Sequence, residues 1–281
     1  MIYRSRIATL RPIALHFAES PLAPMDSLPT NSELWQSTLN WTPSEFQQSQ
    51  FQQLYTEVLS GNQRLNLTRI TSPEEFWEKH LWDSLRGFFP GTHLDLEPDQ
   101  SPNQSLKLID IGTGAGFPGL PLAIAQPTWD FNLVDSTRKK IQFVHETIQT
   151  LKLPNVRCFV ERAEALGQDS RHREQYDIAT IRAVATATVC AEYCIPLLKV
   201  GGTAILYRGQ WTDYEQDELK AALEQLGSEL LYCETFVTPL TESRRTCLIL
   251  RKSFPTHPFY PRAIGIPTQK PLSSTPITEF D

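Results

Sequence analysis

The sequence predicts an α/β fold with a mostly parallel sheet of seven strands, preceded by a short helical segment. Three observations lead to this prediction. A glycine-rich loop joins a short apolar strand to a helix in the stretch from Leu106 to Asp135. Strand-like and helix-like runs alternate from there to about residue 226, as parallel strands with helical crossovers require. The last two strand-like runs have no helix between them and are expected to pair antiparallel.

The glycine-rich loop is the first candidate functional element. Asp110 closes the first strand, and Gly112, Gly114 and Gly116 follow it at alternate positions. Glycine tolerates positive φ and lets a ligand approach the backbone, and the N–H groups that open the next helix point into such a loop. Asp135 closes the second strand, where a doubly wound fold presents a carboxylate to a ribose. The loop is therefore expected to bind a nucleotide cofactor.

Two cofactors fit the spacing of these residues, and an ordinary turn without a ligand is the third interpretation. Gly114, Gly116 and Gly119 spell the GxGxxG pattern of dinucleotide binding. In the other register, Asp110 stands before three alternating glycines, where it can help hold a cationic amino-acid group, which describes S-adenosylmethionine. Five alternating strands followed by a hairpin match the seven-stranded, Rossmann-like class I S-adenosylmethionine-dependent methyltransferase fold better than a six-stranded dinucleotide fold. The strand pattern therefore favours S-adenosylmethionine.

The remaining elements of the core follow in chain order. Strands are predicted near Val156 to Val160, Asp177 to Ile181, Thr203 to Tyr207, Glu229 to Val237 and Thr246 to Leu250. Helices are predicted over Thr137 to Leu151, Thr186 to Leu198 (closed by Gly201-Gly202) and Thr212 to Leu226 (closed by Gly227). Together these elements place the methyltransferase core at residues 106–252.

Residues 33–90 are predicted to form an N-terminal helical segment. Capping boxes begin at Thr42 and Ser72, each with proline at the first helical position and apolar residues at near-helical spacing behind it. In the second helix, His80, Asp83 and Ser84 make one polar patch at i, i+3 and i+4. The patch is either a face whose polar groups are satisfied by water or by one another, or part of a functional site.

The segments outside the helices and strands are expected to be irregular. Residues 1–32 are predicted to be a disordered leader, residues 91–105 a linker, and residues 253–281 a basic C-terminal tail. From residue 243 to residue 278 there are Lys and Arg residues but no acid, with aromatic residues among them. Such a stretch suits a nucleic-acid backbone, although a solubilising terminus has the same composition.

Composition bounds the class of protein. The net charge of -6 argues against a chain coated in nucleic acid, and no apolar run approaches a membrane span. Five cysteines, an odd number, show no CxxC or Cys/His spacing, so we expect no metal and a reducing cytoplasm. We expect a cytoplasmic protein, without a membrane partner, that is a monomer.

Six motifs, in this order, resemble the ribosomal RNA small subunit methyltransferase G family, also called glucose-inhibited division protein B. They are NLTRI (66–70), HLWDSL (80–85), DIGTGAGFPGLPLA (110–123), VDSTRKK (134–140), IRAVA (181–185) and YPRAIGIPTQKPL (260–272). The resemblance spans roughly residues 34–272. It departs from the family pattern in the last motif, at Ile264 and Ile266 and at Gln269, where a basic residue is usual.

The resemblance implies S-adenosylmethionine-dependent N7-methylation of one guanine in 16S ribosomal RNA, as naked RNA or in the small ribosomal subunit. Carried over by position, the cofactor contacts fall on Gly112, Phe117, the Asp135-Ser136-Thr137 turn, Ala163-Glu164 and Arg182, beside Asp110, Gly114 and Gly116 of the glycine loop. The substrate candidates are polar or basic positions in the motifs, after the strands and in the tail: Asn66, His80, Lys139, Arg208, Arg244, Arg245, Arg262 and Lys270.

The chemistry of N7 decides what to expect of the catalytic residues. Guanine N7 has a free lone pair and no proton, so methyl transfer needs alignment rather than a general base. No Asp/Asn-Pro-Pro-Tyr motif, which would hold an exocyclic amine, follows the fourth strand, where Ile181-Arg182-Ala183 stands. Arg182 is the catalytic candidate, since an arginine fork can approach guanine N7 and O6 or a flanking phosphate. An ion pair that closes the sheet edge is its alternative role.

Three functions therefore compete. The first is a ribosomal RNA methyltransferase, the second a small-molecule or protein methyltransferase on the same fold, and the third a non-enzymatic, nucleotide-binding RNA chaperone. The acid-free tail favours the first over the second. The glycine loop with Asp110 and Asp135 favours the first over the third.

Overall fold

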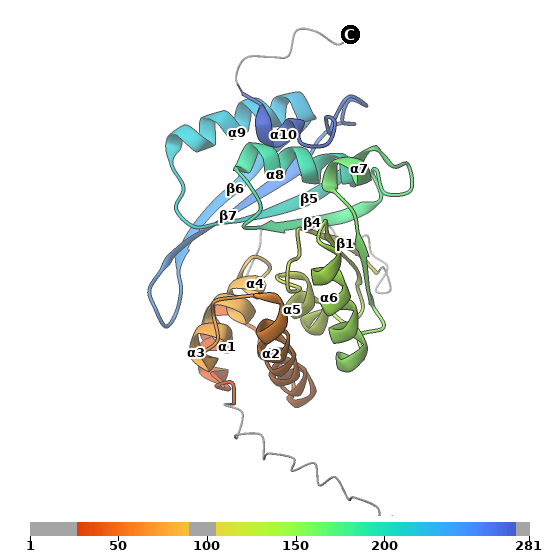
Figure 1. Cartoon of the computed structure of the whole chain (residues 1–281). Helices are drawn as coiled ribbons and strands as arrows, with labels where there is room; N and C mark the ends of the chain where they lie inside the picture. Colours follow the sequence, from red (N-terminus) through yellow and green to blue (C-terminus); the bar gives the residue numbers. More distant parts are fainter. Residues whose placement is uncertain (1–26, 90–104, 274–281) are drawn as a thin grey trace, which may run out of the picture.

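The computed structural model describes residues 27–89 and 105–273 of the 281-residue chain. A seven-stranded sheet with the order β3-β2-β1-β4-β5-β7-β6 lies between two layers of helices (Figure 1). The first five strands pair in parallel, and β7 pairs antiparallel with both β5 and β6. The predicted seven-stranded fold with a terminal hairpin is confirmed.

The strands are β1 (Lys107–Ile111), β2 (Asp130–Asp135), β3 (Val156–Val160), β4 (Tyr176–Arg182), β5 (Leu198–Arg208), β6 (Ser228–Val237) and β7 (Arg244–Lys252). Before the sheet come α1 (Ser32–Leu39), α2 (Glu45–Leu65), α3 (Pro73–Phe76), the π-helical η1 (Trp77–Trp82) and α4 (Asp83–Arg86). The later helices are α5 (Gly119–Ala125), α6 (Arg138–Leu151), α7 (Ala163–Gln168), α8 (Ala187–Cys194), the 3₁₀ turn η2 (Ile195–Leu197), α9 (Asp213–Leu226) and α10 (Ile266–Gln269).

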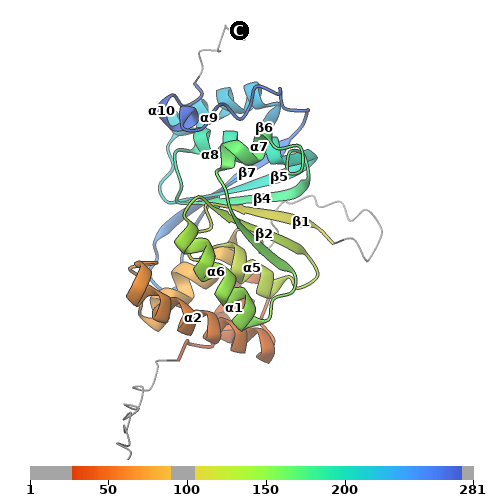
Figure 2. The ribbon, with the colours of Figure 1, turned by 45° about the vertical axis from the view of Figure 1, so that its right-hand side comes forward.

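The sheet separates two hydrophobic cores because successive side chains of a strand point to opposite faces. Leu108, on β1, packs with the N-terminal helices, α5 and α6, whereas its neighbour Ile109 packs with α7, α8 and α9. Figures 1 and 2 show these two groups of helices on opposite sides of the sheet. The N-terminal helices are thus part of the first core rather than an appendage.

Of the two helix starts predicted in the N-terminal segment, one is confirmed and the other is displaced. Ser72 caps α3 through the N–H of Glu75, with Pro73 in the first turn, as predicted. The prediction for α2 was wrong by two residues: its N-cap is Ser44, and Gln47 completes the capping box. Thr42 instead lies outside the helix and donates to the side chain of Gln36. Ser44-x-x-Gln47 has the same capping-box spacing as Thr42-x-x-Glu45, and spacing alone does not show which of the two opens the helix.

Three other local features differ from the expectations. The helix expected from Thr186 to Leu198 ends at Cys194, and Gly201-Gly202 lies inside β5. Helices α1, α7 and α10 were not predicted. Arg244 and Arg245, which begin the acid-free basic stretch, lie in β7, which begins two residues before the predicted start of that strand. Short helices carry too few turns to give a periodic pattern.

The predicted irregular segments overlap the described residues only in part. Residues 1–26, 90–104 and 274–281, which hold most of the leader and the linker, lie outside the described residues. The leader prediction reached too far, since Leu28 contacts the first core, its N–H bonds the Gln52 side chain, and α1 begins at Ser32. The predicted tail also begins as packed structure, with Thr256, Tyr260 and Leu272 buried.

Candidate cofactor and substrate site

The glycine loop is held in shape by the acid at the end of β2. Gly112, Gly114 and Gly116 all have positive φ, between 62° and 98°, which only glycine adopts at low cost. The carboxylate of Asp135 accepts from the Gly114 N–H at 3.1 Å and from the Thr137 N–H at 2.8 Å. Asp135 therefore ties the loop after β1 to the turn that opens α6.

Asp110 lies beneath this loop and does not face the pocket. It is fully buried and accepts from the Gly119 N–H at 3.1 Å and the Thr180 hydroxyl at 2.9 Å. Burial raises the pKa of Asp110 to about 6, although these hydrogen bonds oppose the shift. Asp110 does not line the pocket, because its oxygens support the start of α5 and bind Thr180, so its predicted contact with a cationic group of the cofactor stays a prediction.

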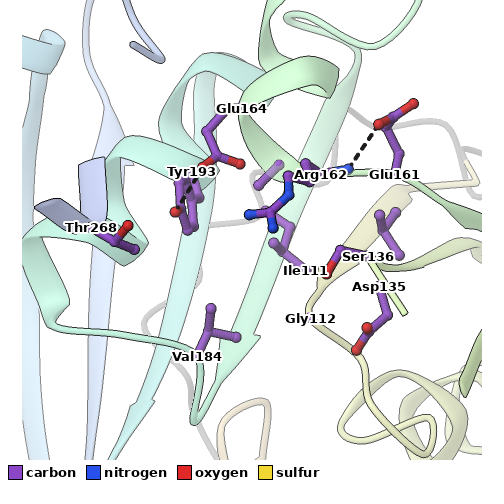
Figure 3. Close-up of a pocket in the computed structure, with 12 residues that line it drawn as sticks. Ile111, Gly112, Asp135, Ser136, Glu161, Arg162, Glu164, Val184, Tyr193 and Thr268 are labelled. Atoms are coloured by element: carbon purple, nitrogen blue, oxygen red, sulfur yellow. Dashed lines mark hydrogen bonds between the residues drawn. The ribbon is translucent and has the colours of Figure 1, made fainter. Parts of the chain in front are cut away.

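A pocket opens at the carboxyl ends of the strands, where doubly wound sheets bind ligands (Figure 3). Of the predicted cofactor residues, Gly112, Asp135, Ser136, Ala163 and Glu164 line it. The other lining residues are Ile111, Val134, Glu161, Arg162, Val184, Tyr193 and Thr268. Backbone amides, an apolar wall and carboxylates in one pocket fit a nucleoside with an amino-acid group.

Glu164 is the most enclosed polar group of this pocket. It is 3% exposed, and its Oε1 accepts from the Tyr193 hydroxyl at 3.1 Å and from the Gly265 N–H at 3.0 Å. Tyr193 and Thr268 were missed by sequence reasoning. Thr268 had a signal, since it stands in the last of the six motifs, whereas Tyr193 lies in an apolar helix and had none.

Gly114, Gly116, Phe117, Thr137 and Arg182 do not line the pocket. The Phe117 ring turns away to the N-terminal helices and stacks on His80, with 4.3 Å between ring centroids and 10° between planes. The glycine loop and η1 therefore meet at this aromatic pair.

Arg182, at the end of β4, is oriented by the N-terminal helices. Its NH1 donates to the carbonyl oxygen of Lys79 at 3.0 Å and to the carboxylate of Asp83 at 3.1 Å. The Arg182 and Asp83 side chains are 16% and 10% exposed, so water screens this ion pair little. Arg245 of β7 approaches the other oxygen of Asp83 at 3.7 Å. Asp83 thus links β4, β7 and the helical segment.

His80 completes this cluster but is not a cationic RNA contact. It is 8% exposed, its Nε2 lies 2.9 Å from the Thr68 hydroxyl, and its Nδ1 lies 3.4 Å from NH2 of Arg182. Burial, with the charges of Arg182 and Lys79, lowers the pKa of His80 to about 3. The prediction that His80 binds substrate is corrected: it is a neutral, enclosed partner of Arg182.

The other substrate candidates differ in accessibility. Asn66, Lys139, Arg244 and Lys270 are exposed. Arg208 is partly buried and donates to the carbonyl oxygen of Ala185 at 2.6 Å.

Arg262 is the second substrate candidate to be corrected. It is 6% exposed, and its guanidinium pairs with fully buried Glu192 of α8 at 2.6 Å and 2.9 Å. With Nε and NH2 both bonded to Glu192, little of this guanidinium is left for an RNA phosphate.

Among residues 27–89 and 105–273, no three His, Cys, Asp or Glu side chains cluster as metal ligands would. In the same part of the chain, no helix has the length and apolar character that crossing a membrane requires.

Comparison with known proteins places this site in a family. The family profile described as "rRNA small subunit methyltransferase G" matches residues 47–246. The chain belongs to the rRNA small subunit methyltransferase G family. A relative from Trichormus variabilis, named Ribosomal RNA small subunit methyltransferase G, is 55% identical over 87% of this chain and 98% of its own length. A relative of the same name from a Nostoc species is 54% identical over the same shares.

Membership of the methyltransferase G family decides between the two cofactors that the glycine loop allowed. A methyltransferase takes its methyl group from S-adenosylmethionine, and the pocket has the amides and carboxylates to hold that cofactor. The family also favours an enzyme over a non-enzymatic RNA chaperone.

Proposed function

We propose that the chain transfers a methyl group from S-adenosylmethionine to N7 of one guanine in the small-subunit ribosomal RNA. The observation that carries this proposal is the placement of Arg182 at the end of β4, next in the chain to the loop whose Val184 lines the cofactor pocket. The relatives named for small-subunit ribosomal RNA supply the substrate class.

The cofactor is held, in this proposal, by the loops after the first three strands. Gly112 offers backbone without a side chain, Asp135 and Ser136 lie at the end of β2, and Ala163 and Glu164 open α7. When bound, S-adenosylmethionine supplies an electrophilic methyl group. Ile111 and Val184 give the pocket an apolar wall that limits water near that group.

The protein has to align the guanine rather than remove a proton from it. His80 is neutral and enclosed, and Asp110 lies below the loop, so neither residue is placed as a general base. This arrangement suits N7, whose lone pair needs no deprotonation. Orientation of the two reactants is then the main source of rate.

Arg182 is the residue that we propose to orient the guanine or its flanking phosphate. A guanidinium has five N–H donors in a planar fork. Contacts with Lys79, Asp83 and His80 use three of them, so the fork is fixed in direction while donors remain for the substrate. Exposed Lys139, Arg244 and Lys270, and Asn66, are the proposed contacts to the rest of the RNA.

The test is methyl transfer from labelled S-adenosylmethionine to deproteinised 16S ribosomal RNA and, separately, to assembled small subunits. We expect label at one guanine, with chain cleavage there after reduction and aniline treatment, which marks N7-methylation. Label on an exocyclic amine, or none on either substrate, would overturn the proposal. The arm that accepts more label identifies the assembly state of the substrate.

Arg182→Ala tests the residue assignment within the same assay. We expect kcat to fall by roughly tenfold or more while the dissociation constant for S-adenosylhomocysteine is unchanged, because an orienting contact is made in the transition state. Lys199→Ala is the matched control, since Lys199 forms an exposed ion pair with Asp177 at the far end of the sheet. Unchanged kcat in a folded Arg182→Ala variant would remove Arg182 from the mechanism.

A further inference from the structure

The last described stretch, residues 256–272, is called here the C-terminal segment. It packs against the helices on one face of the sheet, with α10 beside α8 and α9 (Figure 1). Its composition, with Arg262 and Lys270 and no acid, resembles an RNA-binding tail. Its contacts instead connect it to the cofactor pocket.

Buried polar contacts fix the segment in place. The guanidinium of Arg262 pairs with Glu192, as described above. Arg173 donates to the carbonyl oxygens of Tyr260 at 2.6 Å and Thr256 at 2.8 Å. Gln168 donates to the carbonyl oxygen of Pro261 at 2.7 Å. Three side chains from outside the segment therefore fasten its backbone.

The fastened segment reaches the cofactor pocket at two points. The Gly265 N–H donates to Glu164, and Thr268 lines the pocket. Figure 3 shows Thr268 near Tyr193, on the side of the pocket opposite Ser136 and Asp135. The segment thus forms a wall that faces the turn after β2.

The polar groups of this wall have defined roles as donors or acceptors. The Thr268 hydroxyl donates its proton to the carbonyl oxygen of Gly265 at 2.9 Å. The Tyr193 hydroxyl donates to Glu164. Toward the pocket, the Thr268 oxygen therefore presents lone pairs and accepts from an N–H donor.

We propose that the C-terminal segment is part of the cofactor site and that Thr268 accepts a hydrogen bond from the exocyclic amine of adenine. This inference rests on the cofactor location given under the proposed function. It makes the part of the segment around Thr268 a wall for the nucleoside, while exposed Lys270 stays the proposed contact to RNA. It also makes Thr268 a determinant of adenine over a 6-oxo purine, which carries no amine.

The test is calorimetric titration of the full chain with S-adenosylhomocysteine and with S-inosylhomocysteine. We expect the wild type to prefer the adenine compound and Thr268→Val to bind it about three- to tenfold more weakly, the scale of one neutral hydrogen bond. Thr268→Val should also lose most of the preference. Thr268→Ser, which keeps the hydroxyl, should restore both. Thr268→Trp, which fills the pocket, should reduce binding of either compound.

Two controls separate this inference from its alternatives. Ile264→Ser changes a side chain that is 57% exposed in the same segment and should bind both compounds as the wild type does. Lys270→Ala tests an RNA role through the KM for RNA. If folded Thr268→Val and Thr268→Trp both bind S-adenosylhomocysteine normally, the inference is wrong. If the wild type binds neither compound, the proposed function fails as well.

Discussion

At the scale of single residues, the cluster around Arg182 joins the N-terminal helices to the end of β4. His80 lies between Phe117, Thr68 and Arg182, where a second positive charge would be costly. Asp83 accepts from Arg182 and lies near Arg245, so it is the one anion between two cations in this cluster. His80 and Asp83 each lead to a separate prediction.

His80 predicts a pH dependence of folding. Its pKa is about 3 in the folded chain and near 6.5 when unfolded, so the unfolded state binds more protons between these values. The contribution of His80 to unfolding free energy is constant above pH 6.5. It falls below pH 6.5 by up to about 1.4 kcal/mol per pH unit. Urea titrations from pH 5 to pH 8 should show a flatter profile for His80→Gln than for the wild type; parallel profiles would refute the prediction.

Asp83 predicts a kinetic effect through Arg182. In Asp83→Asn the shape is kept but the charge that orients the guanidinium is lost. We expect kcat to fall by roughly ten- to a hundredfold, the scale of a small misalignment, with a smaller change in KM for RNA. Glu75→Gln is the control, because it removes the charge of a carboxylate whose side chain is 45% exposed and which pairs with Lys79 rather than with Arg182. Equal kcat for the two variants would show that Asp83 does not position Arg182.

At the scale of elements, the start of α2 decides how the N-terminal helices join the first core. Ser44 and Gln47 form a reciprocal cap, and Gln47 also donates to the carbonyl oxygen of Ile124 at the end of α5. One capping side chain therefore joins two helices that lie far apart in sequence.

The cap assignment for α2 predicts that substitutions of Ser44 and of Thr42 lower the free energy of unfolding by different amounts. Ser44→Ala removes the acceptor for the Gln47 N–H and should lower the free energy of unfolding by about 1 kcal/mol. Thr42→Ala, at the position that the sequence favoured, should cost less than about 0.5 kcal/mol, since its side chain is outside the helix. Chemical denaturation of both variants measures this. A larger loss for Thr42→Ala would contradict the cap assignment.

At the scale of the whole molecule, charges with similar sequence context have different environments. Arg244 is exposed on β7, while Arg262 is enclosed against Glu192 of α8. Removing one partner of a buried pair leaves the other charge desolvated and unpaired. The two arginines should therefore differ in what they stabilise.

Arg262→Ala should lower the free energy of unfolding by about 3–5 kcal/mol, whereas Arg244→Ala should change it by less than about 0.5 kcal/mol. Arg244→Ala should instead weaken the salt dependence of RNA binding, because one fewer phosphate contact releases one fewer counterion. Thermal or urea unfolding and RNA titrations at several salt concentrations measure the two effects. The assignments would be reversed if Arg262→Ala were stable and altered only RNA binding.

The sequence predicted those features that repeat along the chain. Alternating strands and helices, the missing helix before β7 and the glycine loop each have a local pattern, and each is confirmed. Of the predicted cofactor residues, Gly112, Asp135 and Glu164, which end or follow strands or open a helix, line the pocket, and their contact with the cofactor stays a prediction.

The failures share a physical cause, which is that burial of a polar residue depends on what packs over it. Arg262 and Lys270 have the same charge in one motif, but only Arg262 meets Glu192, some 70 residues away in the chain. In the sequence, His80 looks like part of a polar surface patch, but in the structure the Phe117 ring covers it. Asp110 resembled a ligand group, yet α5 and Thr180 use its oxygens. No local pattern records these tertiary contacts.

The position of β7 has a consequence for synthesis on the ribosome. β7 lies between β5 and β6, so β6 has no neighbour in the sheet until β7 has been translated. An emerging polypeptide that ends before Arg244 would expose the unpaired edges of both strands, which are templates for aggregation. The wall that Thr268 gives to the pocket is completed later still. Complete formation of the cofactor pocket should therefore wait until the residues through Thr268 have left the ribosome.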